Sequence, residues 1–192
     1  MSQPITTQRH SLLVRVTHWI TTFSFFGLVI SGGAILLAHP RLYWGETGAV
    51  DGPSLVDLPL PFVFGLSGWG RYLHFLSAWL YVLAGIPYVV SLLFTRHFPR
   101  IYNRPQRLTY LAVVFILFPI MIWTGFAMSP AITSVFPFLV TMLGGQQSAR
   151  TIHFVVTNAL ILFLIVHVIM VFLTGFTAHM RAMITGEQTW AD

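Results

Sequence analysis

The chain has 192 residues, of which 56% are hydrophobic and only 8% are charged. Soluble domains carry a charge on about a quarter of their residues, so this composition indicates an integral membrane protein. Cysteine is absent, which excludes disulfides, thiolate ligands and iron–sulfur clusters. Histidine occurs eight times and becomes the obvious metal ligand.

Four segments are apolar over the length of about 20 residues that a helix needs to cross a bilayer. In chain order, we expect membrane-spanning helices at about 12–38, 70–94, 108–128 and 150–176. The polar N-terminal segment enters the first span without a small-residue cleavage site, so we expect this helix to be retained. The sequence predicts an all-α integral membrane protein, in which residues 1–192 form one four-transmembrane-helix bundle domain.

Two loops of this bundle are long. The loop over 39–69 is rich in proline and glycine, and we expect it to cap one face of the membrane. The loop over 129–149 contains a short apolar run broken by Pro137, which suits an interfacial segment better than a fifth crossing. The first loop also offers an aromatic surface suited to docking a periplasmic redox partner: Trp44, Phe62, Phe64 and Trp69.

The arginines are distributed unevenly between the two sides, and lysine is absent. Short loops rich in arginine stay in the cytoplasm. One side would carry Arg9, Arg15, Arg96, Arg100, Arg104, Arg107 and Arg181, and the other Arg41, Arg71 and Arg150. We therefore expect a bacterial inner-membrane protein with both termini cytoplasmic and both long loops periplasmic. The net charge of +5 reflects this topology, so we expect membrane lipid and no nucleic acid as a partner.

Four histidines lie inside the expected spans, where an imidazole loses water and needs a partner. His153 and His167 are 14 positions apart, about 21 Å along one face of a helix. By depth, His74 and His153 form an outer pair, while His18 and His167 form an inner pair. Two imidazole pairs stacked within a helix bundle are what two bis-histidine b-type haems require. We expect the other histidines to be solvated surface residues: His10, His39, His97 and His179.

An arginine stands three positions before three of these ligands, in RVTH, RYLH and RTIH. Arg15, Arg71 and Arg150 are thereby placed to hydrogen-bond the haem carboxylates near the membrane surface. The alternative is that these arginines only extend to the membrane surface at helix ends. The third span has no histidine, and we expect it to pack through its large side chains: Phe115, Phe118, Met121 and Trp123.

The pattern of four spans and four histidines resembles the di-haem cytochrome b subunits of formate dehydrogenase and nickel-iron hydrogenase, over essentially the whole chain. IYNRPQRLTYLAVV (101–114) resembles a YN..Q+..Y stretch of that family. TGFAMSP (124–130) resembles TGLAMSP of thiosulfate-reductase-type cytochromes b. The resemblance implies that the four histidines are axial ligands of iron, and that Asn103 lies near a quinone headgroup beside the inner haem.

The residues themselves also offer Asn103, Gln106 and Arg107 as polar groups that could bind a quinone at a helix mouth, or that only cap the third helix. Two functions follow. The first is transfer of electrons between the quinone pool and a periplasmic oxidoreductase partner, plausibly a molybdenum enzyme. The second is a self-sufficient superoxide:ubiquinone oxidoreductase, with Arg71 and Arg150 at its outer entrance. A third, non-redox interpretation is a histidine-lined metal or proton pathway, which would leave the protein colourless.

Overall fold

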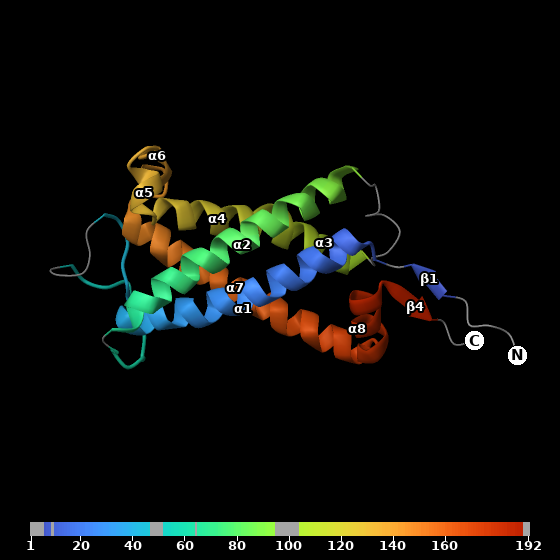
Figure 1. Ribbon diagram of the computed structural model, residues 1–192. Helices are drawn as coiled ribbons and strands as arrows, with labels where there is room; N and C mark the ends of the chain where they lie inside the picture. The colour runs from blue at the N-terminus through green and yellow to red at the C-terminus, as the bar shows by residue number, and fades with distance from the viewer. Residues whose placement is uncertain (1–5, 9, 47–51, 64, 95–103, 190–192) are drawn as a thin grey trace, which may run out of the picture. The chain divides into compact units, whose positions relative to one another are not determined.

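The computed structural model describes residues 6–8, 10–46, 52–63, 65–94 and 104–189. Within this part of the chain, four helical segments are long and apolar enough to cross a membrane. They are α1 (Leu12–Ala38), α2 (Leu66–Phe94), the third span over Leu108–Ala127, and α7 (Gln146–Leu173), as Figure 1 shows. The expectation of a mostly helical protein with four spans is confirmed.

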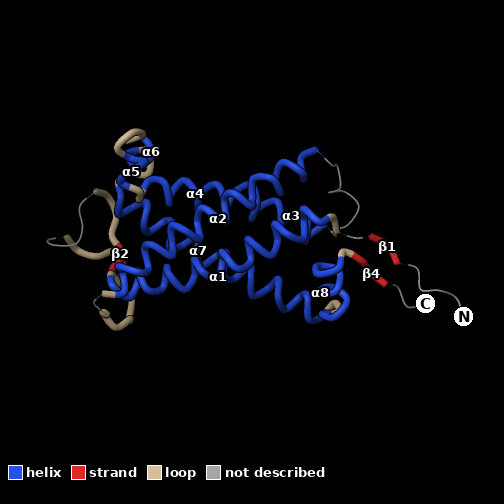
Figure 2. Tube along the Cα trace, viewed as in Figure 1, coloured by secondary structure: helices blue, strands red, loops and turns tan. Residues whose placement is uncertain are grey.

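In the described part of the chain, short strands that the sequence did not predict supplement the helices, and Figure 2 draws them in red. Strand β1 (Thr6–Gln8) pairs antiparallel with β4 (Glu187–Thr189). Strand β2 (Arg41–Leu42) pairs antiparallel with β3 (Val56–Asp57), where an exposed ion pair joins Arg41 Nε to Asp57 Oδ1 at 3.2 Å. Exposed ion pairs add little stability, so the backbone pairing holds this turn of the long loop.

The described residues group into two compact units. The first contains α1, α2, β1, β4, the end of α7 from His167 onward, and α8 (Phe176–Thr185). The second contains β2, β3, the third span, α5 (Pro130–Thr133), α6 (Phe138–Thr141) and α7 up to Val166. Helices α5 and α6 are single short turns within the loop over 129–149, and the place of this loop at the membrane interface stays a prediction. That the chain forms a single domain stays a prediction.

Small residues line the contact between α1 and α2. On both helices buried positions recur every seven residues: Thr17, Ser24, Ser31 and Ala38 on α1, and Gly70, Ser77 and Ala84 on α2. Ala34 of α1 is buried as well. Small side chains let membrane helices approach closely, since lipid supplies no hydrophobic force between them. A Cβ at Gly70 would lie 3.3 Å from the Ser31 carbonyl oxygen, and the large side chains of Phe23 and Ile30 point outward instead.

Glycines with positive φ determine where three helices begin. Gly65 (φ +84°) precedes α2, Gly145 (φ +122°) precedes α7, and Gly175 (φ +112°) precedes α8. The second span therefore starts at Leu66 instead of 70. The expected fourth helix over 150–176 was wrong at both ends, because α7 runs from Gln146 to Leu173 and a separate helix, α8, follows the break.

The third span is interrupted by one π-helical turn. Helix α3 (Arg104–Ala112) passes into η1 (Val113–Leu117) and then into α4 (Phe118–Ala127). Pro119 lies at the start of α4, and a proline has no N–H and its ring clashes with the carbonyl of the preceding turn. A π turn before the proline is a common way to absorb that clash.

The close approach of α1 and α2 gives a stability prediction. A Cβ at Gly27 would lie 2.5 Å from Ser77 Oγ and 3.4 Å from Ser77 Cβ, so we expect Gly27→Val to destabilise the protein by about 1–3 kcal/mol through overpacking. Gly33→Val is the matched control, since a Cβ at Gly33 meets nothing within 4 Å. The measurement is thermal unfolding of the detergent-purified variants by tryptophan fluorescence. Equal midpoints for the two variants would contradict this packing.

Candidate functional site

The inner pair of histidines lies in the first unit. His18 is on α1 and His167 is near the end of α7, close enough to His18 for their charges to interact. The His18 ring meets Trp19 edge to face, with ring centroids 5.5 Å apart. Its Nδ1 atom is buried and has no hydrogen-bond partner among the described residues. The structure thus brings together the two histidines that the sequence paired by depth.

His74 is held on α2 by a hydroxyl group from α1. Ser31 Oγ lies 3.0 Å from His74 Nδ1, and the same hydroxyl donates to the Gly27 carbonyl at 2.6 Å. The Ser31 hydroxyl also lies 3.2 Å from the Leu28 carbonyl. Ser31 is fully buried, so water has no access to this contact.

His153 is held on α7 by the same arrangement in the second unit. Thr124 Oγ1, on α4, lies 2.8 Å from His153 Nδ1 and donates to the Ile120 carbonyl at 2.8 Å. Thr124 is also fully buried. Next in the chain, Gly125 faces the ring, since a Cβ added there would lie 3.8 Å from His153 Cε1.

These contacts indicate which ring nitrogen carries the proton. A hydroxyl carries one proton, and both Ser31 and Thr124 donate it to a carbonyl one turn earlier, so each oxygen can only accept from the imidazole. His74 and His153 therefore carry the proton on Nδ1, and each keeps a lone pair on Nε2. Histidines that bind a metal through one ring nitrogen typically donate a hydrogen bond from the other ring nitrogen. The donor set fits a bis-histidine haem iron.

Two of the three site arginines bind backbone carbonyls. Arg15 Nη1 donates to the Ile184 carbonyl at 2.6 Å. Arg150 donates from Nη1 to the Arg41 carbonyl at 3.1 Å and from Nη2 to the His39 carbonyl. The Arg71 side chain is exposed. Pairing of these arginines with haem carboxylates stays a prediction.

Arg150 belongs to a larger set of contacts between the first turns of α7 and residues 39–46, which we call the strap. Ser148 Oγ accepts from the Gly45 N–H at 2.8 Å, and the Gln147 N–H donates to the Gly45 carbonyl at 3.0 Å. Thr151 Oγ1 donates to the Tyr43 carbonyl at 2.7 Å. The strap is thereby fixed to the part of α7 that carries His153. Sequence reasoning missed it, because only the glycines at its contact indicate a close approach of backbones.

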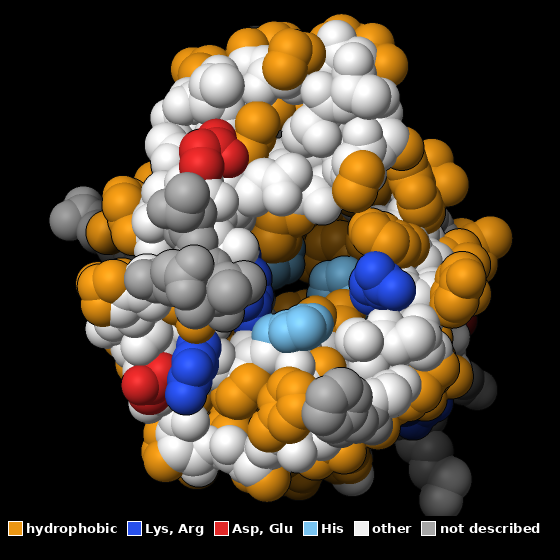
Figure 3. Space-filling view, turned by 90° about the vertical axis from the view of Figure 1, so that its left-hand side faces the viewer, with side chains coloured by type: hydrophobic (Ala, Val, Ile, Leu, Met, Phe, Trp, Pro, Cys, Tyr) orange, Lys and Arg blue, Asp and Glu red, His pale blue; other side chains and the backbone are white. Residues whose placement is uncertain are grey.

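The aromatic residues expected on the first loop are exposed. Trp44 is 59% exposed and Phe62 54% exposed in the second unit, and Trp69 is 48% exposed in the first. Figure 3 shows one face of the molecule, where hydrophobic side chains predominate and a few arginines and histidines appear. The use of these exposed aromatic residues in docking a partner stays a prediction.

The structure describes only some of the other residues that the sequence singled out. Asn103, Phe64 and His97 lie outside the described residues, and the side chains of Gln106 and Arg107 are not described. His39 is exposed, as expected. His179 lies 2.9 Å from the Thr174 hydroxyl at the break between α7 and α8.

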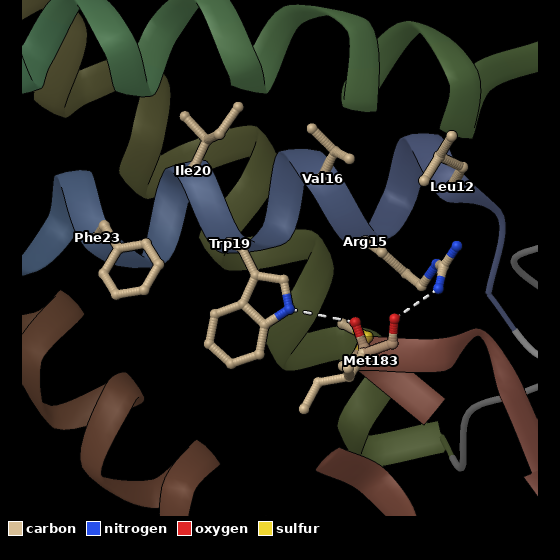
Figure 4. A pocket seen from close by; sticks show the side chains of 8 residues that line it. Leu12, Arg15, Val16, Trp19, Ile20, Phe23 and Met183 are labelled. Carbon is tan, nitrogen blue, oxygen red and sulfur yellow. Dashed lines mark hydrogen bonds between the residues drawn. The ribbon is translucent and has the colours of Figure 1, made fainter. Parts of the chain in front are cut away.

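An open groove of about 530 Å³ lies between α1 and the end of α8 (Figure 4). Two of its polar groups are paired, since Trp19 Nε1 donates to the Met183 carbonyl at 3.1 Å and Arg15 Nη1 donates to the Ile184 carbonyl. Arg15 Nε is buried and has no hydrogen-bond partner among the described residues. The remaining lining is apolar: Leu12, Val16, Ile20, Phe23 and the side chains of Met183 and Ile184. The two hydrogen bonds cap the last turn of α8, and they attach this helix to the part of α1 that carries His18.

Comparison with known proteins identifies the family. The family model described as prokaryotic cytochrome b561 matches residues 9–186. The chain is 29% identical to a protein of Azospira oryzae described as "putative protein-methionine-sulfoxide reductase subunit YedZ1", across 93% of this chain and 96% of that protein. No solved structure matches the chain.

The chain therefore belongs to the prokaryotic cytochrome b561 family. It is a multi-pass membrane cytochrome of b type that functions in electron transfer, and haem b is the cofactor that the family implies. This confirms the resemblance to bacterial membrane cytochromes b.

The strap gives a second prediction. A Cβ at Gly145 would lie 2.4–2.6 Å from backbone atoms of Gly45 and Glu46, so we expect Gly145→Ala to displace the strap from α7. Gly144→Ala is the control, because it adds a similar left-handed strain of about 1–2 kcal/mol but meets only Ser148 Oγ, at 3.7 Å. We expect faster proteolysis within 39–62 and a lower unfolding midpoint in Gly145→Ala. Matching cleavage rates in both variants would show that the strap does not depend on this contact.

Proposed function

We propose that this member of the prokaryotic cytochrome b561 family is a di-haem cytochrome of the bacterial inner membrane. It would carry electrons between the quinone pool, bound on the cytoplasmic side, and an oxidoreductase partner in the periplasm. The observation that carries the proposal is the pair of outer histidines, each of which has its Nδ1 within hydrogen-bond distance of a buried hydroxyl on another helix.

Each ligand pair would draw on two helices. His18 and His167 would hold the inner haem, and their proximity in the first unit supports this pairing. His74 and His153 would hold the outer haem, and their matching hydrogen bonds support an equivalent role. When bound, haem b supplies a one-electron iron couple whose filled axial positions suit electron transfer instead of oxygen binding.

The arginines would keep charge balanced at the two membrane surfaces. Arg71 is exposed three positions before His74 and is placed to hydrogen-bond a haem carboxylate. Arg15 and Arg150 each use at least one guanidinium N–H on backbone carbonyls and can extend a remaining N–H to a carboxylate. Arg15 and Arg150 would thus hydrogen-bond both a haem carboxylate and the nearby backbone.

The partner would be a periplasmic oxidoreductase, plausibly a molybdenum enzyme. The name of the Azospira relative makes a protein-methionine-sulfoxide reductase the first partner to test. Quinol oxidation yields two electrons and two protons, and reduction of the sulfoxide to methionine and water consumes the same numbers. Electrons would then flow from quinol to the periplasm. The exposed Trp44 and Phe62 are suited to the docking surface.

The alternative is a self-sufficient superoxide:ubiquinone oxidoreductase. The exposed Arg71 favours it, since a small anion needs a positive entrance on the periplasmic side. Arg150 contributes less, because the strap carbonyls already occupy its guanidinium. Superoxide-driven haem reduction in the purified protein, without any partner, would favour this alternative over the first function.

The direct test of the di-haem proposal is a pyridine haemochrome count with a reduced-minus-oxidised spectrum of the purified protein. We expect two haem b per chain. A single haem per chain, or a colourless protein, would contradict the proposal.

The ligand pairs give a third prediction. We expect His74→Ala and His153→Ala to deplete one haem, and His18→Ala and His167→Ala to deplete the other, because each iron loses one of its two axial ligands. Haem content and low-temperature spectra of the four variants provide the measurement. The pairing by depth fails if the His74 and His18 variants lose the same haem.

The quinone site gives a fourth prediction. If the amide of Asn103 binds a quinone headgroup, its loss removes a hydrogen bond worth about 1–3 kcal/mol, which is roughly a tenfold to hundredfold decrease in quinol-driven reduction. Stopped-flow reduction of Asn103→Ala and Asn103→Leu by quinol tests this, and reduction by dithionite is the control. Wild-type quinol kinetics in both variants would place the quinone elsewhere.

A further inference from the structure

We propose that two hydroxyl–glycine pairs, Ser31-Gly32 and Thr124-Gly125, are positioning elements that set the redox potential of the outer haem. The inference rests on the proposed function, since it takes His74 and His153 as the outer ligands. It assigns a role to residues that lie one helix away from each ligand. Ser31-Gly32 belongs to no motif that the sequence analysis singled out, and Thr124-Gly125 begins the TGFAMSP segment, to which no ligand role was assigned.

The two pairs have the same construction although they lie on different helices in different units. In each, the hydroxyl contacts Nδ1 of a histidine on another helix, at 3.0 Å for Ser31 and 2.8 Å for Thr124. In each, the glycine that follows faces the same ring, since an added Cβ would lie 3.6 Å from His74 Cε1 or 3.8 Å from His153 Cε1.

Each hydroxyl is itself oriented by the backbone. Ser31 donates to Gly27 at 2.6 Å and Thr124 donates to Ile120 at 2.8 Å, so both oxygens face the imidazole as acceptors. Both side chains have no exposed surface, and water therefore cannot replace the hydroxyl if it is removed. The proton on Nδ1 is thus fixed by the protein before any iron is bound.

A hydrogen bond from Nδ1–H makes the opposite nitrogen a stronger donor to a metal. A stronger donor stabilises ferric iron over ferrous iron and lowers the midpoint potential. Removal of the hydroxyl should therefore raise the midpoint potential of the outer haem. The glycine leaves the ring room to lie against the helix that carries the hydroxyl, which keeps the hydrogen bond short.

The inner pair is built differently. Nδ1 of His18 is buried and has no partner among the described residues, so no hydroxyl polarises this ring there. Loss of Ser31 or Thr124 should therefore change one haem and leave the other unaltered. This asymmetry separates a tuning role from a general loosening of the helices.

The experiment compares Thr124→Val, which removes the hydroxyl at nearly constant volume, with Thr124→Ser, which keeps it. Redox titration and ferric electron paramagnetic resonance of the purified holoprotein are the readouts. For Thr124→Val we expect the ferric-to-ferrous ratio of one haem to change by about tenfold at a given potential, an upward shift of about 59 mV for a one-electron couple. Thr124→Ser should titrate like the wild type.

Ser31→Ala should shift the same haem in the same direction, and Ser24→Ala is its control. Ser24 is a buried serine seven residues before Ser31 on the same face of α1. Its loss removes a hydroxyl from the contact between α1 and α2 but leaves the hydroxyl at His74 in place. Loss of the outer haem in Thr124→Val with its retention in Thr124→Ser would also support the proposal.

Unchanged potentials and resonance spectra in Thr124→Val and Ser31→Ala would overturn the inference while leaving the di-haem function intact. Equal shifts in Thr124→Val and Thr124→Ser, or shifts of different haems by Ser31→Ala and Thr124→Val, would also overturn it. A wild-type protein without two haems would instead overturn the proposed function itself.

Discussion

An imidazole buried in a membrane loses its hydrogen bonds to water, and an unpaired polar group is costly there because lipid offers no replacement. At His74 and His153 the chain meets this demand with a hydroxyl that is itself anchored to a helix carbonyl. The register of α1 on α2, and of α4 on α7, must bring hydroxyl and ring together, so much of the helix packing serves these two contacts.

The small-residue contact between α1 and α2 provides that register. Gly70 approaches the backbone of Ser31 closely and lies four residues before His74, about one helical turn. Larger side chains at these positions would separate the helices and withdraw the hydroxyl from the ring. The same serine is therefore a packing residue through its size and a functional residue through its oxygen. Stability and cofactor chemistry depend here on one helix contact.

Arginines at the helix ends have a comparable double use. Arg150 holds the strap through two carbonyls, and Arg15, with Trp19, caps the last turn of α8. A guanidinium has five N–H donors in a fixed plane, so it can bind backbone and still offer a donor to an anion. In this way the segments outside the spans are attached to the same helical turns that precede His18 and His153.

The sequence by itself determined that this is a membrane protein with four spans, and it singled out the histidines as candidate ligands. Both conclusions follow from local features, because hydropathy and polar residues inside an apolar segment can be recognised without knowing which helices meet. The sequence located the helix ends less well: α7 begins directly after Gly145 and ends two residues before Gly175, and both glycines have positive φ. Only the tertiary structure showed that Ser31 and Thr124 contact His74 and His153, and that the strap lies on α7. Serine and threonine are common in membrane helices, so their partners follow from which helix faces meet and not from spacing along the chain.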